Sequence, residues 1–271
     1  MILLSNSHSV GLLDRKARFY GTYAAAFEGS ALVGVVGHFW NCNCILQTRE
    51  DYAAELSALA VRTSGRPLAG MLGPAGQVRA ALAGLGIAPR QLRLDSIESL
   101  YQLSLSALRV PPELASGKVR VRPARQTDLT LLSAWRAAFC VEALHVLDTP
   151  ELHQTARDAE QRGIADGHIW LAEVDGQVVA TSGFNAAVAE AVQIGGVYTP
   201  VSQRRRGYAR AAVAQSLLDA RARGVSLSLL FTGDDNVAAQ RAYRALGYER
   251  TGDYRIVTVE EPCFLLQSAR L

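Results

Sequence analysis

The chain has 271 residues, of which 49% are hydrophobic and 20% charged, with a formal net charge of +3 at pH 7. This composition is that of an ordinary globular protein and excludes a disordered chain. The small charge surplus argues against general nucleic-acid binding, so only local clusters of charge carry an electrostatic signal. The length is compatible with one domain or two.

The sequence shows neither a signal for export nor a membrane-spanning segment. The N-terminus has no basic segment before its short apolar start, which argues against a signal peptide. The longest apolar stretch, 31–46, is interrupted by His38, Asn41 and Asn43 and is shorter than the roughly 20 residues of a membrane helix. We expect a soluble, cytoplasmic protein without a membrane partner.

The cysteines and histidines do not form a metal-binding pattern. There is no C-x-x-C pair, and no histidine lies at zinc-finger spacing from a thiol. We therefore expect no metal site and four reduced thiols, as in a cytosolic protein. The cysteines are Cys42, Cys44, Cys140 and Cys263.

In chain order, the N-terminal half predicts a hairpin, a strand, a helix, a second strand and a second helix. The residue ranges of these elements are 19–27 with 30–40, 43–47, 50–65, 67–73 and 74–87. Next, Pro111 and Pro112 block helix and interior strand, and Ser116–Gly117 loosens the chain. This joint predicts two domains, 1–112 and 113–271.

The C-terminal half has a similar order of elements after an opening strand and helix. Asp175–Gly176 forms the turn of its hairpin. The ranges are 118–123, a helix from Thr127, 168–174 with 177–185, 191–199, 207–224, 225–231, 237–247 and a last strand pair at 254–266. At an offset of 161, Gly86 falls on Gly247 and two helices align without a gap. This internal repeat predicts duplication of one α/β unit.

Three arginines stand directly before a predicted helix. The first N–H groups of a helix have no internal partner, and with the helix dipole they bind phosphate. Gly207 lets an anion approach the backbone, and the arginines Arg204, Arg205 and Arg206 add donors and charge. A solvated charged face is the alternative interpretation of this run.

Arg204-x-x-Gly207-x-Ala209 resembles the R/Q-x-x-G-x-G/A signature of the GCN5-related N-acetyltransferase (GNAT) family. Asn236, Ala239, Tyr243, Gly247 and Tyr248 have the spacing of that family's following helix. The segments "VRVRPARQTDL" and "IGGVYTP" resemble its opening strand and helix and its central strand. The resemblance implies an α/β (α+β) fold of two GNAT-like units. Each would have a mixed, mostly antiparallel sheet flanked by helices, and the N-terminal unit would be truncated.

The resemblance also implies acetyl-CoA as co-substrate. The strand at Gly196–Tyr198 would splay from its neighbour and pair with the pantetheine arm, and a backbone N–H near Val197 or Tyr198 would stabilise the oxyanion. The loop before the helix at 208 would hold the pyrophosphate. The cofactor-binding residues implied are Val197, Tyr198, Arg204, Arg205, Arg206, Gly207, Tyr208, Ala209 and Asn236.

By the same resemblance, Tyr243 would be the general acid, because a phenol stays protonated at neutral pH and can protonate a leaving thiolate. Asn236 would either bond the cofactor arm or cap the helix. Glu142 is the predicted general base, with a surface carboxylate as the alternative interpretation. His145, His153 or a water chain are further options for the base.

The N-terminal copy departs from the pattern. At the same offset Tyr243 falls on Leu82 and Asn236 on Ala75, and no arginine signature precedes its helix. Glu50 and Asp51 would occupy the place where phosphate binds. We therefore expect a degenerate N-terminal half and a catalytic C-terminal half.

The predicted function is N-acetyl transfer from acetyl-CoA to a primary amine by direct attack. A non-catalytic acyl-CoA-binding or sensor protein is the first alternative. Aminoacyl transfer from tRNA is the second, although the balanced charge gives no RNA-binding patch. The acceptor, a small-molecule amine or a peptide, and the oligomeric state are not readable from the sequence, because fold does not determine substrate.

Overall fold

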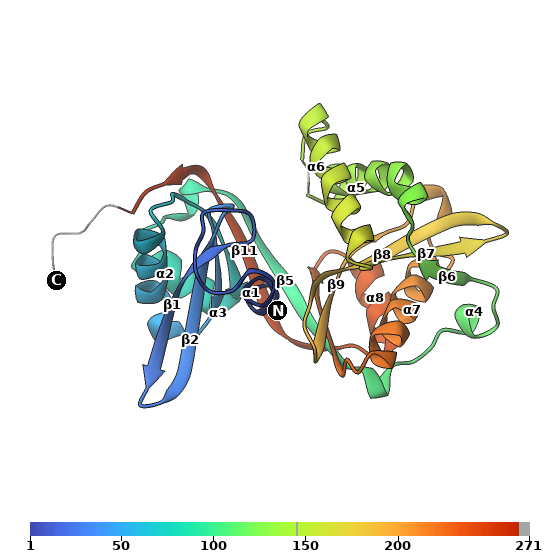
Figure 1. Ribbon diagram of the computed structural model, residues 1–271, viewed down its shortest axis with the longest axis horizontal. Coiled ribbons are helices and arrows are strands. Elements are labelled where there is room, and N and C mark those ends of the chain that lie inside the picture. Colours follow the sequence, from blue (N-terminus) through green and yellow to red (C-terminus); the bar gives the residue numbers. More distant parts are fainter. Residues whose placement is uncertain (145, 266–271) are drawn as a thin grey trace. The chain divides into compact units, whose positions relative to one another are not determined.

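A computed structural model describes residues 1–144 and 146–265. The chain forms two compact units, each with its own core (Figure 1). The N-terminal unit contains residues 2–100, 231–235 and those from 250 on, and the C-terminal unit contains residues 101–230 and 236–249. The units are therefore discontinuous in sequence, whereas the boundary predicted after residue 112 is linear.

Three strands cause this interleaving because each contributes residues to both units. They are β5 (Leu92–Ser104), β10 (Leu227–Gly233) and β11 (Glu249–Cys263). In the N-terminal unit the strand order is β1-β2-β3-β4-β11-β5, and in the C-terminal unit it is β5-β10-β9-β8-β7-β6. Strand β5, from the N-terminal half of the sequence, thus lies beside β10 and β11, which come from the C-terminal half.

The C-terminal unit is a mixed sheet flanked by helices. Its remaining strands are β6 (Arg120–Pro123), β7 (Ile169–Val174), β8 (Gln177–Ala187) and β9 (Ala191–Tyr198). Its helices are α4 (Pro112–Ala115), α5 (Leu129–Leu144), α6 (Pro150–Ala165), α7 (Tyr208–Ala222) and α8 (Val237–Leu246). Strands β6 to β9 pair antiparallel, and β9 pairs parallel with β10.

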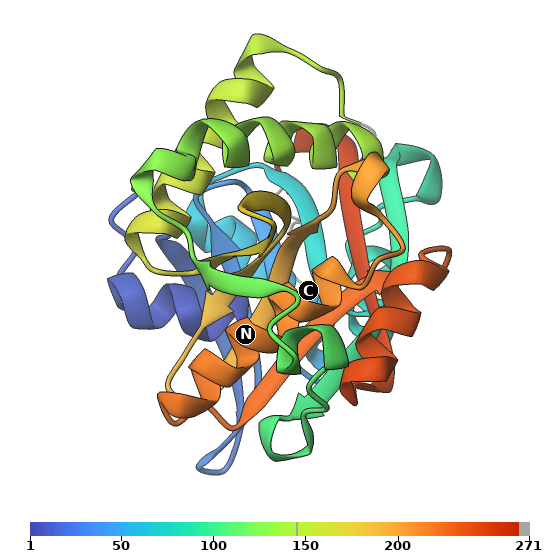
Figure 2. The same cartoon turned by 90° about the vertical axis from the view of Figure 1, so that its right-hand side faces the viewer.

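The alternation of side chains along β7 shows which helices cover each face of this sheet. Ile169 and Leu171 pack with Leu132 of α5. Trp170 points to the opposite face, into the core that contains side chains of α7 and α8. Helices α5 and α6 therefore lie on one side of the sheet, and α7 and α8 on the other (Figures 1 and 2).

The N-terminal unit repeats part of this plan. Its elements are α1 (Ile2–Val10), β1 (Gly21–Glu28), β2 (Ala31–Phe39), β3 (Asn43–Gln47), α2 (Glu50–Ser64), β4 (Leu68–Pro74) and α3 (Ala75–Gly84). Strands β3 and β4 pair parallel, as β9 and β10 do. Gly86 and Gly247, which the repeat aligns, both have a left-handed backbone, with φ of 70° and 102°.

Five elements differ from the sequence-based expectation. Up to residue 265 the predicted pair at 254–266 is not formed, because β11 is one strand that pairs with β4. Helices α1, α4 and α6 and strand β5 were not predicted. Helix α4 begins at Pro112, which was expected to block a helix, because proline is tolerated at the first helical position. Helix α6 is polar over most of its length, so few apolar residues mark it in the sequence. Within the described residues, no helix combines the length and the apolar character that crossing a membrane requires.

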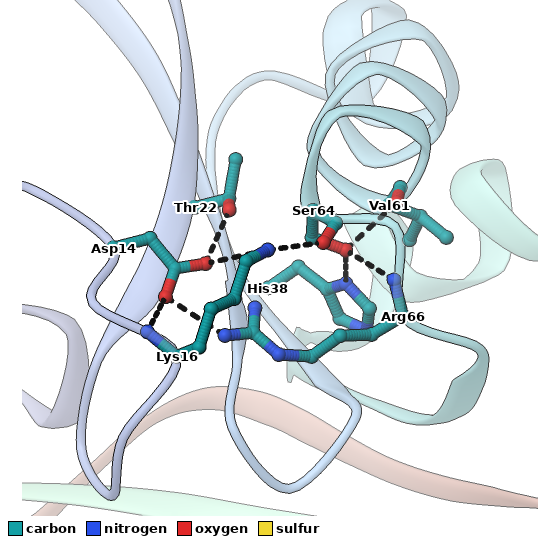
Figure 3. Close-up of polar contacts among 7 residues, drawn as sticks. All are labelled: Asp14, Lys16, Thr22, His38, Val61, Ser64 and Arg66. Atoms are coloured by element: carbon teal, nitrogen blue, oxygen red, sulfur yellow. Dashed lines mark hydrogen bonds and ion pairs between the residues drawn. The ribbon is translucent and has the colours of Figure 1, made fainter.

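A buried polar network fixes the segment before β1 in the N-terminal unit (Figure 3). Asp14 accepts hydrogen bonds from the Arg66 guanidinium and the Thr22 hydroxyl, both at 2.8 Å. His38 Nδ1 lies 2.7 Å from Ser64 Oγ. The Arg66 guanidinium, next to Asp14, holds the pKa of that carboxyl well below its usual range. The network ties the loop, β1 and the end of α2 together.

Asp14→Asn is therefore expected to destabilise this unit by about 2–3 kcal/mol at neutral pH, because it removes a charge-assisted bond from nearly buried partners. Because the folded-state pKa is depressed, this contribution is present above the usual carboxyl pKa of about 4 and is lost as the pH falls through the folded-state value. Urea unfolding at neutral and acidic pH measures it. Asp51→Asn is the control, since the Arg49–Asp51 pair is exposed to solvent and an exposed ion pair contributes little to stability. Equal losses in the two variants would contradict the prediction.

Candidate functional site

The loop before α7 has the backbone of an anion-binding site. Arg205 and Gly207 both adopt left-handed conformations, with φ of 63° and 83°. A left-handed non-glycine residue costs of order 1–3 kcal/mol and is found mainly at functional sites. Gly207 begins the helix without a side-chain cap, and the first helical hydrogen bond runs from Ala211 N–H to Gly207 C=O at 3.0 Å. The preceding N–H groups of α7 are therefore available to a ligand.

Cationic side chains surround this helix start. A pocket in front of Gly207 is lined by Lys118, Arg205, Arg206 and Arg210, together with Tyr208, Glu113 and Val119. Two of these cations, Lys118 and Arg210, were not predicted, because they lie outside the arginine run. The helix dipole and four cations make this pocket suited to a polyanion such as a pyrophosphate.

One carboxylate also lies in this pocket. Glu113 accepts a hydrogen bond from Arg210 Nη2 at 2.6 Å, and its oxygen occupies the space that a Cβ on residue 207 would need. Position 207 therefore has no room for a side chain, which accounts for the glycine there.

Arg204 points away from this pocket. Its guanidinium forms a two-pronged ion pair with Glu142, with both N–O distances 2.6 Å, and donates to the carbonyl of Thr199 at 2.9 Å. Arg204 lowers the pKa of the Glu142 carboxyl. Arg204 is thus not among the residues that line the pocket, and Glu142 is paired and held ionised, which disfavours it as a base. The cofactor-binding role of Arg204 and the base role of Glu142 stay predictions.

The pairing of the central strand β9 with β10 covers only the first part of β9. The parallel ladder of β9 with β10 is recorded only at residues 191–193. Further along β9, Gly196 has φ of 61° and a register shift lies between Thr181 and Gly183 of β8. The backbone at Gly196–Tyr198 thus has no recorded partner on β10 within the described residues. This is the geometry that the predicted role of Val197 and Tyr198 requires.

Tyr243 lies on α8 against the core, with its ring 5.8 Å from that of Tyr248. Its side chain is 9% exposed, and no hydrogen bond to its hydroxyl is recorded among the described residues. Burial raises the pKa of Tyr243 to about 12. The phenol therefore remains a proton donor over the whole physiological pH range.

Asn236 caps a helix. Its side-chain oxygen accepts a hydrogen bond from Ala239 N–H at 3.1 Å at the start of α8. Of the two roles that the sequence left open, the structure shows capping. The amide NH₂ group remains the part of Asn236 that can donate to a ligand.

A second, smaller pocket lies on the opposite face of the sheet from α7. Its lining comes from α5, α6, β8 and β9, and consists of Leu132, Trp135, Arg136, Phe139, Glu160, Thr181, Gly196 and Tyr198. Glu160 is 7% exposed, and its nearest charged partner is Arg136, with an N–O distance of 3.4 Å. Burial raises the pKa of this carboxyl, and Arg136 only partly offsets it.

The sequence analysis did not single out Glu160, because α6 was not predicted. Of the two proposed histidines, His153 does not line this pocket. His153 lies in an exposed pair with Asp148 at 2.7 Å, and His145 lies outside the described residues. The sequence separation of Glu160 and Gly196 does not indicate that they line one pocket, because only the tertiary fold brings the two residues together.

Comparisons with known proteins agree with this geometry. The model of the acetyltransferase (GNAT) family matches residues 139–248. A GCN5-related N-acetyltransferase from Kribbella flavida has a TM-score of 0.60 at 19% identity, covering 96% of this chain and 95% of its own. An acetyltransferase of the GNAT family from Colwellia psychrerythraea has a TM-score of 0.53 at 15% identity, covering 88% and 85%.

A tandem GNAT protein from the clavulanic acid biosynthesis pathway has a TM-score of 0.55 at 11% identity, covering 94% of this chain and 86% of its own. No curated protein matches the chain in sequence. At these identities the structures establish the fold, and the family model covers the splayed strand β9, the arginine loop, α7 and the helix of Tyr243. Residues 139–248 of this chain therefore match the model of the acetyltransferase (GNAT) family, whose members use acetyl-CoA.

Proposed function

We propose that the C-terminal unit transfers an acetyl group from acetyl-CoA to a primary amine by direct attack. The observation that carries this proposal is the uncapped start of α7 at Gly207, with Lys118, Arg205, Arg206 and Arg210 around it. When bound, acetyl-CoA supplies a thioester whose carbonyl carbon accepts the amine while the C–S bond breaks. The residues around Gly207 fit the pyrophosphate of acetyl-CoA, because the N–H groups at the start of α7 can bind an anion and the four cations can neutralise its charge.

Two further features support the chemistry. The N–H groups near Val197 and Tyr198 on the splayed part of β9 can donate to the thioester carbonyl, where negative charge develops. Tyr243, whose pKa is raised to about 12, can donate its proton to the departing sulfur. Asn236 can donate through its amide NH₂ while its oxygen caps α8.

We further propose that residues 1–112 correspond to a degenerate copy and that residues 113–271 carry the activity. The N-terminal unit has the same succession of hairpin, strand, helix, strand and helix. Glu50 and Asp51, however, lie in the first turn of α2, where their negative charge would repel a phosphate. The four free thiols are consistent with a reducing, cytoplasmic compartment.

A calorimetric titration of the full chain with acetyl-CoA tests this proposal. One site per chain is expected, because cations surround the start of α7, whereas the first turn of α2 carries Glu50 and Asp51. Two sites would contradict the degenerate assignment of the N-terminal unit. Binding without release of CoA in the presence of any amine would favour the non-catalytic sensor, and absence of binding would overturn the proposal.

A further inference from the structure

We propose that Glu113 is an autoinhibitory residue: its carboxylate competes with the pyrophosphate of acetyl-CoA for Arg210 and for the space in front of Gly207. This inference rests on the proposed binding of acetyl-CoA and adds a regulatory contact to that same site. It starts from a negative charge inside a pocket whose other charged residues are all cations.

The carboxylate of Glu113 lies at the start of α7, where an anion is favoured. It fills the space that a Cβ on Gly207 would need, with its Cδ atom 3.0 Å from that point. The N–H groups of the first turn of α7 attract negative charge to this place. Among the described residues, the hydrogen bonds recorded for this carboxylate come from Arg210 and not from those N–H groups. The carboxylate thus takes the position of an anion and leaves the helix donors to a ligand.

Arg210 holds the carboxylate in this position. Its guanidinium donates to Oε1 of Glu113 from Nη2 at 2.6 Å and from Nε at 3.2 Å, so one oxygen accepts both bonds. The side chains of Glu113 and Arg210 are 16% and 31% exposed, and solvent weakens such a pair. A pyrophosphate carries more charge and more acceptor oxygens than one carboxylate, so it forms the stronger pair with the same guanidinium. The ligand therefore displaces Glu113, and the lost ion pair lowers its affinity.

The exchange requires the side chain of Glu113 to move but not its helix. Leu114 of α4 packs against the cluster that contains Ala211 and Ala212 of α7. The carbonyl of Glu113 accepts a hydrogen bond from Val119 N–H at 2.9 Å. The backbone is thus fixed, whereas the rotatable bonds of the side chain let the carboxylate turn toward solvent. The pocket has a volume of about 550 Å³, which is ample for a pyrophosphate once the carboxylate has turned away.

This contact acts on the part of the cofactor that substrate and product share. Acetyl-CoA and CoA carry the same pyrophosphate, so Glu113 should weaken the binding of both by the same factor. After transfer, the carboxylate competes with CoA for Arg210 as it does with acetyl-CoA. Glu113 should therefore limit inhibition by the product.

The test is Glu113→Gln, which preserves the size of the side chain and removes its charge. Isothermal titration calorimetry of the full chain with acetyl-CoA, CoA and inorganic pyrophosphate measures the affinities. Each ligand should bind at least about fivefold more tightly to the variant than to the wild type, because it no longer breaks a partly exposed ion pair. Glu113→Ala, which also empties the space in front of Gly207, should bind each ligand at least as tightly as Glu113→Gln.

Glu190→Gln is the matched control. Glu190 is an exposed carboxylate of the same unit and lies in the turn before β9, at the opposite end of that strand from the arginine loop. The substitution changes the net charge by the same amount, and the affinities for all three ligands should stay at the wild-type values. Equal tightening in Glu190→Gln and Glu113→Gln would assign the effect to net charge and would overturn the inference.

Thermal melting separates autoinhibition from a structural role. Without ligand, Glu113→Gln should melt at or slightly below the wild-type temperature, because it loses one partly exposed ion pair. With the same excess of acetyl-CoA, its melting temperature should rise more than that of the wild type, because stabilisation by a ligand grows with affinity. Lower stability combined with weaker binding would show that Glu113 positions Arg210 for the phosphate, and would overturn the inference.

The remaining outcomes also decide the inference. Unchanged binding in Glu113→Gln would overturn it, and so would unequal factors for acetyl-CoA and CoA, because Glu113 would then act on the thioester end. If neither protein binds acetyl-CoA, the proposed function fails. Inorganic pyrophosphate then decides the inference alone: tighter binding by the variant supports it, and equal binding overturns it. No binding of any of the three ligands to either protein would overturn both proposals.

Discussion

Tyr243→Phe is expected to lower kcat for acetyl transfer about 10²–10³-fold while leaving acetyl-CoA affinity within a factor of two. The hydroxyl is the only group removed, and it has no recorded hydrogen-bond partner among the described residues, so its loss should cost little stability. Its pKa of about 12 keeps it protonated, which is the state that a general acid needs. Stopped-flow detection of released CoA thiol, with a panel of primary amines as acceptors, measures the effect.

Tyr248→Phe provides a matched control. Tyr248 lies against Tyr243, and its hydroxyl is 2.6 Å from Ser228 Oγ in the buried core. Removing this bond should lower the free energy of unfolding by about 1 kcal/mol with little change in turnover. The two variants thus separate loss of the proton donor from loss of packing. Equal turnover in Tyr243→Phe and the wild type would exclude Tyr243 from the mechanism.

Gly207→Glu is expected to weaken acetyl-CoA binding by at least about 100-fold, or roughly 2.7 kcal/mol. The new side chain would fill the space in front of the helix start, where Glu113 already lies, and would place a second negative charge at the positive end of α7. Isothermal titration calorimetry with acetyl-CoA measures the change directly.

Backbone strain needs its own control, because a side chain at a φ of 83° is unfavourable anywhere. Gly224→Glu supplies it: Gly224 has φ of 93°, lies just beyond the opposite end of α7, and has open space around it. Both variants should lose stability through backbone strain, Gly207→Glu the more because its Cβ also meets Glu113, and only Gly207→Glu should lose affinity. Similar affinity losses at both positions would indicate that strain in α7, rather than an anion site, governs binding.

Local patterns in the sequence were sufficient for most elements of the repeat. The turn at Asp175–Gly176 and the glycine ending α8 at Gly247 require left-handed backbone, and the structure has φ of 50°, 77° and 102° at these three residues. The helix start at Gly207 could be predicted for the same reason, because the arginine run and the glycine that follows it are local features of the sequence. The degenerate character of the N-terminal half stays a proposal that rests on residues such as Glu50.

Contacts between distant residues could not be read from such patterns. Arg204 and Glu142 are 62 positions apart. Their ion pair joins a predicted cofactor-binding residue to the predicted general base, which no local pattern indicates. Glu113 and Arg210 meet over 97 positions. A charged side chain can reach several partners, and only the packing of α4 and α5 against their neighbours selects one.

The sequence by itself determined the order of the hairpins, strands and helices that form the repeat and the residues of the arginine loop, because periodicity, turn chemistry and helix starts depend on neighbouring residues. The tertiary structure alone decided that β5, β10 and β11 run through both units and that Glu160 is buried beside Gly196. The physical reason is that strand partners and buried charges depend on which surfaces the folded chain brings together, and a polar helix such as α6 does not record this in its own sequence.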